Sequence, residues 1–95
     1  MPEAVIVDAI RTPIGRAAKG SLKDLRAEDL AAIPIKEILK RNPQLDPSEI
    51  VDVIHGCGFP EGEQGYNIGR SAAILAGVPI SVPATTVTRF CASSL

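Results

Sequence analysis

Apolar residues along this chain follow two kinds of pattern, continuous β-branched runs and stripes at helical spacing. Continuous runs occupy residues 4–10, 51–55 and 84–90. Such runs are typical of strands that are buried on both faces of a parallel sheet. Two other stretches, 26–41 and 67–76, carry apolar residues at i, i+4, i+7 and i+8, which predicts an amphipathic helix in each. The stripes consist of Ala31, Ile35, Ile38 and Leu39 in the first stretch, and Ile68, Ala72, Leu75 and Ala76 in the second.

Turn-forming residues separate these elements. Pro34 falls inside the first helical stretch, where a proline costs about 3 kcal/mol, so we expect a kink or a restart of the helix there. Asp46-Pro47-Ser48-Glu49 combines an N-cap acceptor, a proline and an acidic residue, which predicts a short helical turn. Gly77 and Pro79 follow the last periodic residue of the second helix and predict its end.

The resulting order is strand, helix, strand, helix, strand and the start of a further helix. Strands that alternate with helices imply right-handed parallel crossovers, so the predicted class is α/β with a parallel-type sheet. Functional sites of open parallel sheets lie at the carboxyl ends of strands. Cys57 and Cys91 both occupy such ends.

Composition narrows the class of protein. The 95 residues are 45% hydrophobic and 22% charged, as in soluble globular domains. A net charge of -1 and three aromatic residues argue against a nucleic-acid or anionic-membrane partner. The sequence has neither a run of about 20 apolar residues nor the basic start of a signal peptide, so a cytoplasmic location is the default expectation. In that compartment the two cysteines are expected to be free thiols.

Cys91 is the main chemical candidate. It follows a β-branched run and Phe90, and it precedes Ala92, Ser93 and Ser94, which indicates a strand-to-helix junction with room for a substrate. The amides and dipole at a helix N-terminus would favour the thiolate, which is the nucleophilic form. A buried structural thiol is the alternative, because free cysteine is among the most buried residue types.

Other motifs are weaker. His55 and Cys57 are too few ligands for a zinc site, so no metal is expected, and a strand-end histidine and a packed cysteine are the simpler interpretation. His55 could serve Cys91 as a general base only if the two strand ends bring the side chains within hydrogen-bond reach. The glycines at 56–69 match neither a dinucleotide fingerprint nor a phosphate loop.

Three ordered segments resemble the thiolases. Val87–Leu95 is similar to their nucleophile segment, Val7–Arg16 to their first strand and turn, and Gly62–Arg70 with the Gly77-Val78-Pro79 stop to the loop and helix before the reactive strand. The likeness runs along the whole chain and is closest to the acetyl-CoA acyltransferase (3-ketoacyl-CoA thiolase) branch. It departs at Thr88, where asparagine is usual, and at Gly69, where alanine is commoner.

The resemblance implies an enzyme of the β-oxidation type that transfers acyl groups through a thioester on Cys91, with 3-oxoacyl-CoA and coenzyme A as substrates and no bound cofactor. The Cys91 amide would help to hold the oxyanion. It further implies that residues 1–95 are a partial thiolase-like N-terminal domain, without the second half of that domain and the C-terminal domain.

The remaining catalytic groups of the family are an activating histidine, a second cysteine and an asparagine–histidine pair, and their segments have no match here. We therefore expect the isolated chain to be inactive and poorly stable. The full-length family implies a homo-oligomer, a dimer or tetramer. Alternatives are a non-catalytic interaction module that docks onto a complementary chain, or a truncated gene fragment without function.

Overall fold

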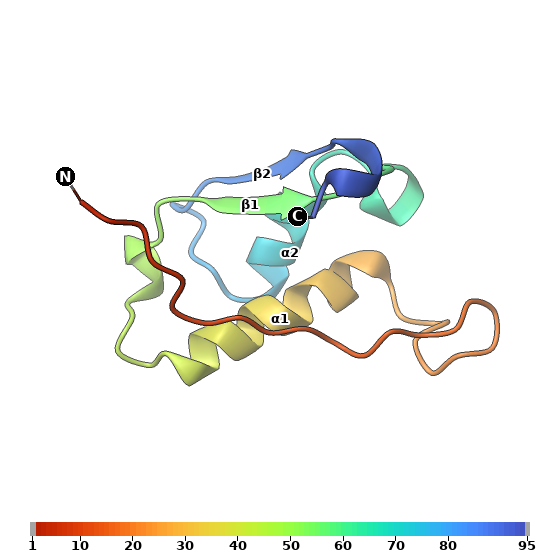
Figure 1. The fold of residues 1–95 in the computed structure, drawn as a ribbon, viewed down its shortest axis with the longest axis horizontal. Coiled ribbons are helices and arrows are strands. Elements are labelled where there is room, and N and C mark those ends of the chain that lie inside the picture. The colour runs from red at the N-terminus through yellow and green to blue at the C-terminus, as the bar shows by residue number, and fades with distance from the viewer. Residues whose placement is uncertain (1, 95) are drawn as a thin grey trace.

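The computed structural model describes residues 2–94 and arranges them as a small sheet with two helices stacked beneath it (Figure 1). The main elements are α1 (Ala27–Arg41), β1 (Val53–Gly56), α2 (Ile68–Leu75) and β2 (Ala84–Val87). Three short 3₁₀ turns complete the order: η1 (Pro47–Glu49), η2 (Gly62–Gln64) and η3 (Phe90–Ala92). No helix within residues 2–94 is long and apolar enough to cross a membrane.

The two strands pair in parallel, as the α/β prediction requires. Val53 lies opposite Ala84 and Gly56 opposite Val87, and α2 forms the crossover between them. Because parallel strands run in the same direction, the carboxyl ends of β1 and β2 meet at one edge of the sheet. The segment after β1, which contains Cys57, and the segment after β2, which contains Cys91, therefore both start from this edge of the sheet.

The core lies between α2, the sheet and α1. Ala73, Val78 and Val82 form its buried centre, and partly buried residues from α1 and both strands pack around it: Ile35, Leu39, Ile50, Val53 and Ala84. Helix α2 contacts the sheet on one side and α1 on the other. Ile35 and Leu39 of the predicted α1 stripe thus face this centre. In α2 the predicted stripe residues Ile68, Ala72 and Ala76 are buried, whereas Leu75 is 48% exposed.

A network of polar contacts fixes the start of α2 against β2. The Asn67 side chain accepts a hydrogen bond from the Arg70 amide (3.2 Å) and donates one to the Ala84 carbonyl (2.9 Å). The Thr86 hydroxyl donates to the same Asn67 side chain (2.7 Å) and accepts from the Gly69 amide (2.9 Å). These bonds satisfy amides that a helix start leaves without partners, and they hold the crossover in register with the strand.

Several turn predictions are confirmed. The Asp46 carboxylate accepts from the Ser48 amide at 3.0 Å, which caps η1. Gly77 adopts a positive φ of 91°, and the Val78 amide donates to the Ala73 carbonyl at 3.0 Å. The end of α2 at Gly77 is therefore as predicted. Helix α1, in contrast, continues unbroken through Pro34, so the predicted restart is wrong. Ile35 and Leu39, which follow Pro34 in α1, pack against the core.

The predicted first strand at residues 4–10 is not formed. This segment is extended but belongs to no sheet, and the side chains of Val5, Ile6 and Val7 are 73%, 91% and 77% exposed. From Asp8 onward the chain runs along α1 (Figure 1), and an ion pair at 3.3 Å ties Asp8 to Arg41 at the end of that helix. A β-branched run favours extended backbone, whereas a strand also needs a neighbour to pair with, and within residues 2–94 β1 and β2 pair with each other.

Candidate functional site

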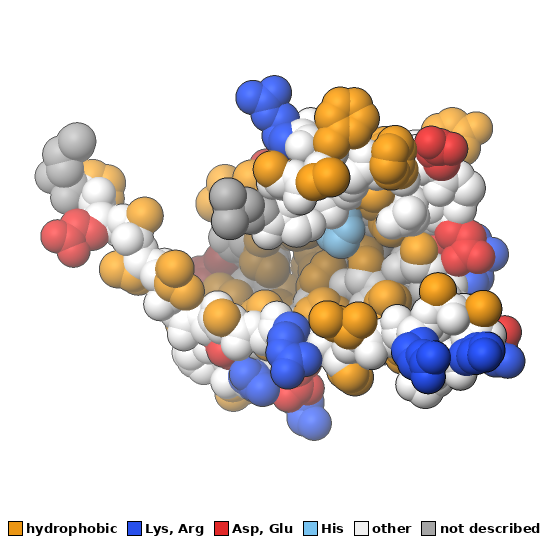
Figure 2. Space-filling model, turned by 45° about the vertical axis from the view of Figure 1, so that its right-hand side comes forward, with side chains coloured by type: hydrophobic (Ala, Val, Ile, Leu, Met, Phe, Trp, Pro, Cys, Tyr) orange, Lys and Arg blue, Asp and Glu red, His pale blue; other side chains and the backbone are white. Residues whose placement is uncertain are grey.

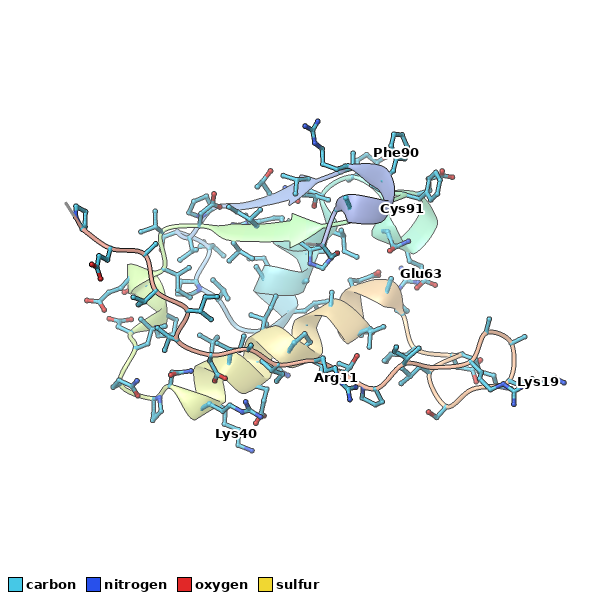
Figure 3. The ribbon with its side chains drawn as sticks, in the orientation of Figure 1. Arg11, Lys19, Lys40, Glu63, Phe90 and Cys91 are labelled. Atoms are coloured by element: carbon cyan, nitrogen blue, oxygen red, sulfur yellow. The ribbon has the colours of Figure 1, made fainter. Side chains whose placement is uncertain are left out.

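The site candidate lies where the chain leaves the carboxyl ends of β1 and β2. The Cys57 amide donates to the Val87 carbonyl at 3.0 Å and continues the strand pairing by one residue. Cys57 is then buried, with 5% of its surface exposed, and its thiol contacts the Gln64 side chain at 3.5 Å. Cys91, in contrast, is exposed (Figure 3). Of the two thiols, therefore, Cys91 is the one that a substrate can reach.

Cys91 is the middle residue of the single turn η3, not the first residue of an α-helix as predicted. The hydrogen bonds from Ala92 to Arg89 and from Ser93 to Phe90 span three residues, which tightens the chain into a 3₁₀ turn. Within residues 2–94, therefore, no helix long enough to have a substantial dipole begins at Cys91. The features of this turn that matter chemically are its backbone geometry and its amides.

The turn depends on an unusual conformation of Phe90. Its φ of 51° lies in the left-handed region, which is rare for bulky side chains and costs on the order of 1–3 kcal/mol. The Phe90 ring packs edge to face against Phe59, with 6.1 Å between ring centres. This sharp reversal carries the residue after Phe90 out of the line of β2, so Cys91 projects beyond the sheet.

Hydroxyl groups on both sides of Cys91 hold the reversal. The Ser93 hydroxyl accepts from the Arg89 amide at 2.8 Å and donates to the Phe90 carbonyl at 2.7 Å. The Thr88 hydroxyl donates to the Gly58 carbonyl at 3.2 Å and thereby ties the turn to the loop after β1. Thr88, noted above as a departure from the usual asparagine, thus has a definite structural role.

Gly56 lets the turn approach β1. A Cβ atom added at this position would lie 2.1 Å from the Ser93 carbonyl oxygen, so any side chain would displace the residues after Cys91. The Ser94 hydroxyl donates to the Gly56 carbonyl at 3.4 Å across the same contact. The absence of a side chain at Gly56 is therefore part of how Cys91 is positioned.

The Cys91 amide has no acceptor among residues 2–94, whereas its neighbours in the turn are bonded. Exposed sulfur and unpaired amide therefore belong to one residue. An amide in this position can donate to an oxygen that gains charge when the sulfur attacks a carbonyl group. The turn thus presents an exposed thiol together with an amide that has no acceptor among residues 2–94.

His55 does not join Cys91 in one pocket. It is half-buried at the end of β1 and lines a hollow of about 300 Å³ with Thr12, Gln64 and Ser94, and Cys91 is not among the lining residues. Burial lowers the pKa of His55 from its ordinary value of 6.5. The proposed pairing of His55 with Cys91 as a general base thus gains no support. Among the described residues there is also no group of three or more side chains suited to a metal ion.

The lowered pKa of His55 predicts a pH dependence of folding. The unfolded chain takes up a proton near pH 6.5, and the folded chain takes it up only at lower pH, so stability falls as pH drops below about 6.5. We expect the urea midpoint to decrease between pH 7.5 and 5.5, and His55→Gln to remove most of this decrease. If the urea midpoints of the wild type and of His55→Gln decreased equally between pH 7.5 and 5.5, the assignment of this effect to His55 would be contradicted. The pKa of Glu28 is lowered from its ordinary value of 4.5, mainly by a hydrogen bond from its own amide. The loss of stability on protonation of Glu28 therefore begins only below pH 4.5 and should persist in His55→Gln.

Sites of open parallel sheets lie at the carboxyl ends of the strands, and the exposed Cys91 follows such an end. Residues 4–95 match the family described as Thiolase, N-terminal domain. The chain therefore belongs to the thiolase family.

Relatives match along the entire chain. It is 55% identical over 95 residues to a 3-ketoacyl-CoA thiolase of Aeromonas hydrophila and 55% identical to a beta-ketoadipyl-CoA thiolase of Acinetobacter baylyi. A 3-ketoacyl-CoA thiolase of Photobacterium profundum is 52% identical over the same length. The matches cover 100% of this chain and 24%, 23% and 24% of the three relatives, so the chain spans about a quarter of their length.

Proposed function

We propose that this chain contributes the nucleophile of an acyl transfer between coenzyme A thioesters, with Cys91 as the residue that carries the acyl group. The observation that supports the proposal most directly is the combination of an exposed Cys91 sulfur with an unpaired Cys91 amide. Family membership and the relatives named 3-ketoacyl-CoA thiolase give the substrate class, 3-oxoacyl-CoA. Coenzyme A is a substrate in this scheme, and no bound cofactor takes part.

The proposed reaction has two steps. The deprotonated sulfur of Cys91 attacks the 3-keto carbonyl, the bond between C2 and C3 breaks, C2 takes a proton, and acetyl-CoA leaves. The shortened acyl group remains as a thioester on Cys91 until the thiol of a second coenzyme A attacks it, loses its proton and restores the cysteine. The same steps in reverse give condensation. During each attack the Cys91 amide donates to the oxygen that gains charge.

Residues 1–95 supply only part of this chemistry. The resemblance implies an activating histidine in a Gly-His-Pro stretch and a second cysteine before a glycine run, and neither motif occurs among the 95 residues. Groups that act as a unit lose most of their effect when one is missing. We therefore propose that turnover requires the segments that carry these groups.

A chimera tests the proposal. The matching 95 residues of the Aeromonas hydrophila thiolase are replaced by this chain, and thiolysis of acetoacetyl-CoA by coenzyme A is followed for the chimera and for the isolated chain. We expect turnover by the chimera within about tenfold of the parent enzyme, and none by the isolated chain above a Cys91→Ala control. A folded but inactive chimera would contradict the proposed function. Turnover by the isolated chain would contradict the need for further segments.

A second candidate, docking onto a complementary chain, is favoured by the exposed apolar side chains of Val5, Ile6 and Val7. Figure 2 shows hydrophobic side chains along the N-terminal arm, which extends away from the rest of the molecule. This candidate and the first are compatible if the complementary chain also carries the missing catalytic groups.

A further inference from the structure

We propose that Ser93 is a positioning residue for the acyl transfer, because its hydroxyl sets the direction of the Cys91 amide. The inference rests on the function proposed for Cys91. It concerns a side chain that is not expected to touch the substrate and that acts on the turn η3 from two residues beyond the nucleophile.

The first observation is that one hydroxyl uses both of its hydrogen-bonding functions on the two residues before Cys91. Ser93 accepts from the Arg89 amide at 2.8 Å and donates to the Phe90 carbonyl at 2.7 Å. The Ser93 amide donates to the same Phe90 carbonyl at 3.2 Å. The Phe90 carbonyl oxygen therefore accepts two hydrogen bonds from a single residue.

The second observation is geometric. The Phe90 carbonyl and the Cys91 amide belong to one planar peptide unit, and no peptide bond among residues 2–94 is cis. In a trans unit the C=O and N–H groups point in opposite directions. Fixing the Phe90 oxygen on the Ser93 side therefore points the Cys91 N–H away from the turn, where the structure leaves it without an acceptor. Ser93 thus orients the donor that the reaction uses.

The left-handed Phe90 explains why this peptide needs such support. Its φ of 51° is a conformation that a bulky residue leaves easily unless its surroundings hold it. Rotation about the N–Cα bond of Phe90 would relieve the positive φ, and it would also move the Phe90 carbonyl and turn the Cys91 amide. By bonding on both sides of Phe90, the Ser93 hydroxyl opposes this rotation.

Ser94 provides a matched control. It is the adjacent residue and carries the same side chain, but its hydroxyl makes one long contact of 3.4 Å, to Gly56, and none to the peptide before Cys91. Ser93→Thr keeps the hydroxyl and serves as the conservative variant. Ser93→Ala removes both hydrogen bonds to Arg89 and Phe90.

The experiment compares two reactions of Cys91 in the 95-residue chain at one pH. In acetylation by p-nitrophenyl acetate the sulfur forms a bond to the carbonyl carbon and p-nitrophenolate leaves, through an intermediate with a charged oxygen. In alkylation by iodoacetamide the sulfur displaces iodide and no such oxygen forms. Both reactions need the thiolate, so the ratio of their rates reports the oxyanion donor and not the protonation or exposure of the thiol. Peptide mass mapping separates Cys91 from Cys57.

We expect the ratio for Cys91 to exceed that of N-acetylcysteine by about tenfold or more, since loss of an oxyanion donor typically costs more than this in enzymes. Ser93→Ala should lower the ratio about tenfold, whereas Ser93→Thr and Ser94→Ala should keep it within about twofold. An unchanged ratio in Ser93→Ala, or an equal loss in Ser94→Ala, would overturn the positioning role and leave the proposed function standing. A wild-type ratio equal to that of N-acetylcysteine would overturn both. Faster alkylation of buried Cys57 in Ser93→Ala would mean a loss of folding, and it would overturn the specific role as well.

Discussion

Cys91→Ala in the chimera with the Aeromonas hydrophila thiolase is expected to reduce thiolysis by about 10⁴-fold or more, because removal of a covalent nucleophile costs this much in other enzymes. In the proposed steps, the Cys91 sulfur is the atom of this chain that forms a covalent bond to the acyl group. Substrate binding should survive the change, since the side chain removed is small and exposed. The measurement is kcat for acetoacetyl-CoA at saturating coenzyme A.

Cys57→Ala is the matched control for this experiment. Cys57 follows β1 as Cys91 follows β2, but it is buried, and its thiol contacts Gln64 within the protein. A small cysteine that packs like a hydrophobic residue should tolerate alanine with an activity loss of less than about tenfold. Equal losses for the two variants would mean that the thiol of Cys91 has no special part in the reaction.

Gly69→Ala is expected to destabilise the fold by about 1–3 kcal/mol, the range for an overpacked core. Helix propensity alone would predict the opposite, since alanine is better than glycine inside a helix by about 1 kcal/mol. A Cβ atom at this position would lie 2.5 Å from the Thr85 carbonyl oxygen and 2.9 Å from the His55 Cβ atom. Because one of these atoms is backbone of β2, the strand or α2 must move, and the bond from the Gly69 amide to Thr86 would be strained.

Urea unfolding followed by circular dichroism measures this effect, with Ser71→Ala as the control. Ser71 lies two residues further along α2 on the exposed side of the helix, so alanine there should change stability by less than about 0.5 kcal/mol. If Gly69→Ala were as stable as Ser71→Ala, α2 would have to sit further from β2 than the structure places it.

Gly69 also illustrates what the sequence could and could not predict. The two helices, the caps at Asp46 and Gly77 and the parallel class all follow from local patterns, and the structure confirms them. A glycine in a helix looks unfavourable by the same local reasoning. Glycine is needed at this position because β2 approaches α2 closely there. The contacting strand residue lies seventeen residues later in the sequence, so no local pattern indicates the contact.

The misjudged first strand has a related cause. The run at 4–10 indicates a preference for extended backbone and for burial, but it does not identify the strand with which it would pair. In the structure Ile6 is 91% exposed. At the site, the position of Cys91 after a strand was predicted correctly and the α-helix after it was not. The 3₁₀ turn depends on side-chain bonds from Ser93 and Thr88 and on the left-handed Phe90, none of which has a signature in periodicity.

If Cys91 carries the acyl group, the acyl-enzyme should be observable on this residue. The chimera is mixed with acetoacetyl-CoA without free coenzyme A, quenched in acid and mapped by peptide mass spectrometry. The account predicts one acetyl group on the peptide that contains Cys91, released by hydroxylamine or by added coenzyme A and absent in Cys91→Ala. An active chimera that shows no acyl group on Cys91, or that carries it on Cys57, would contradict the account.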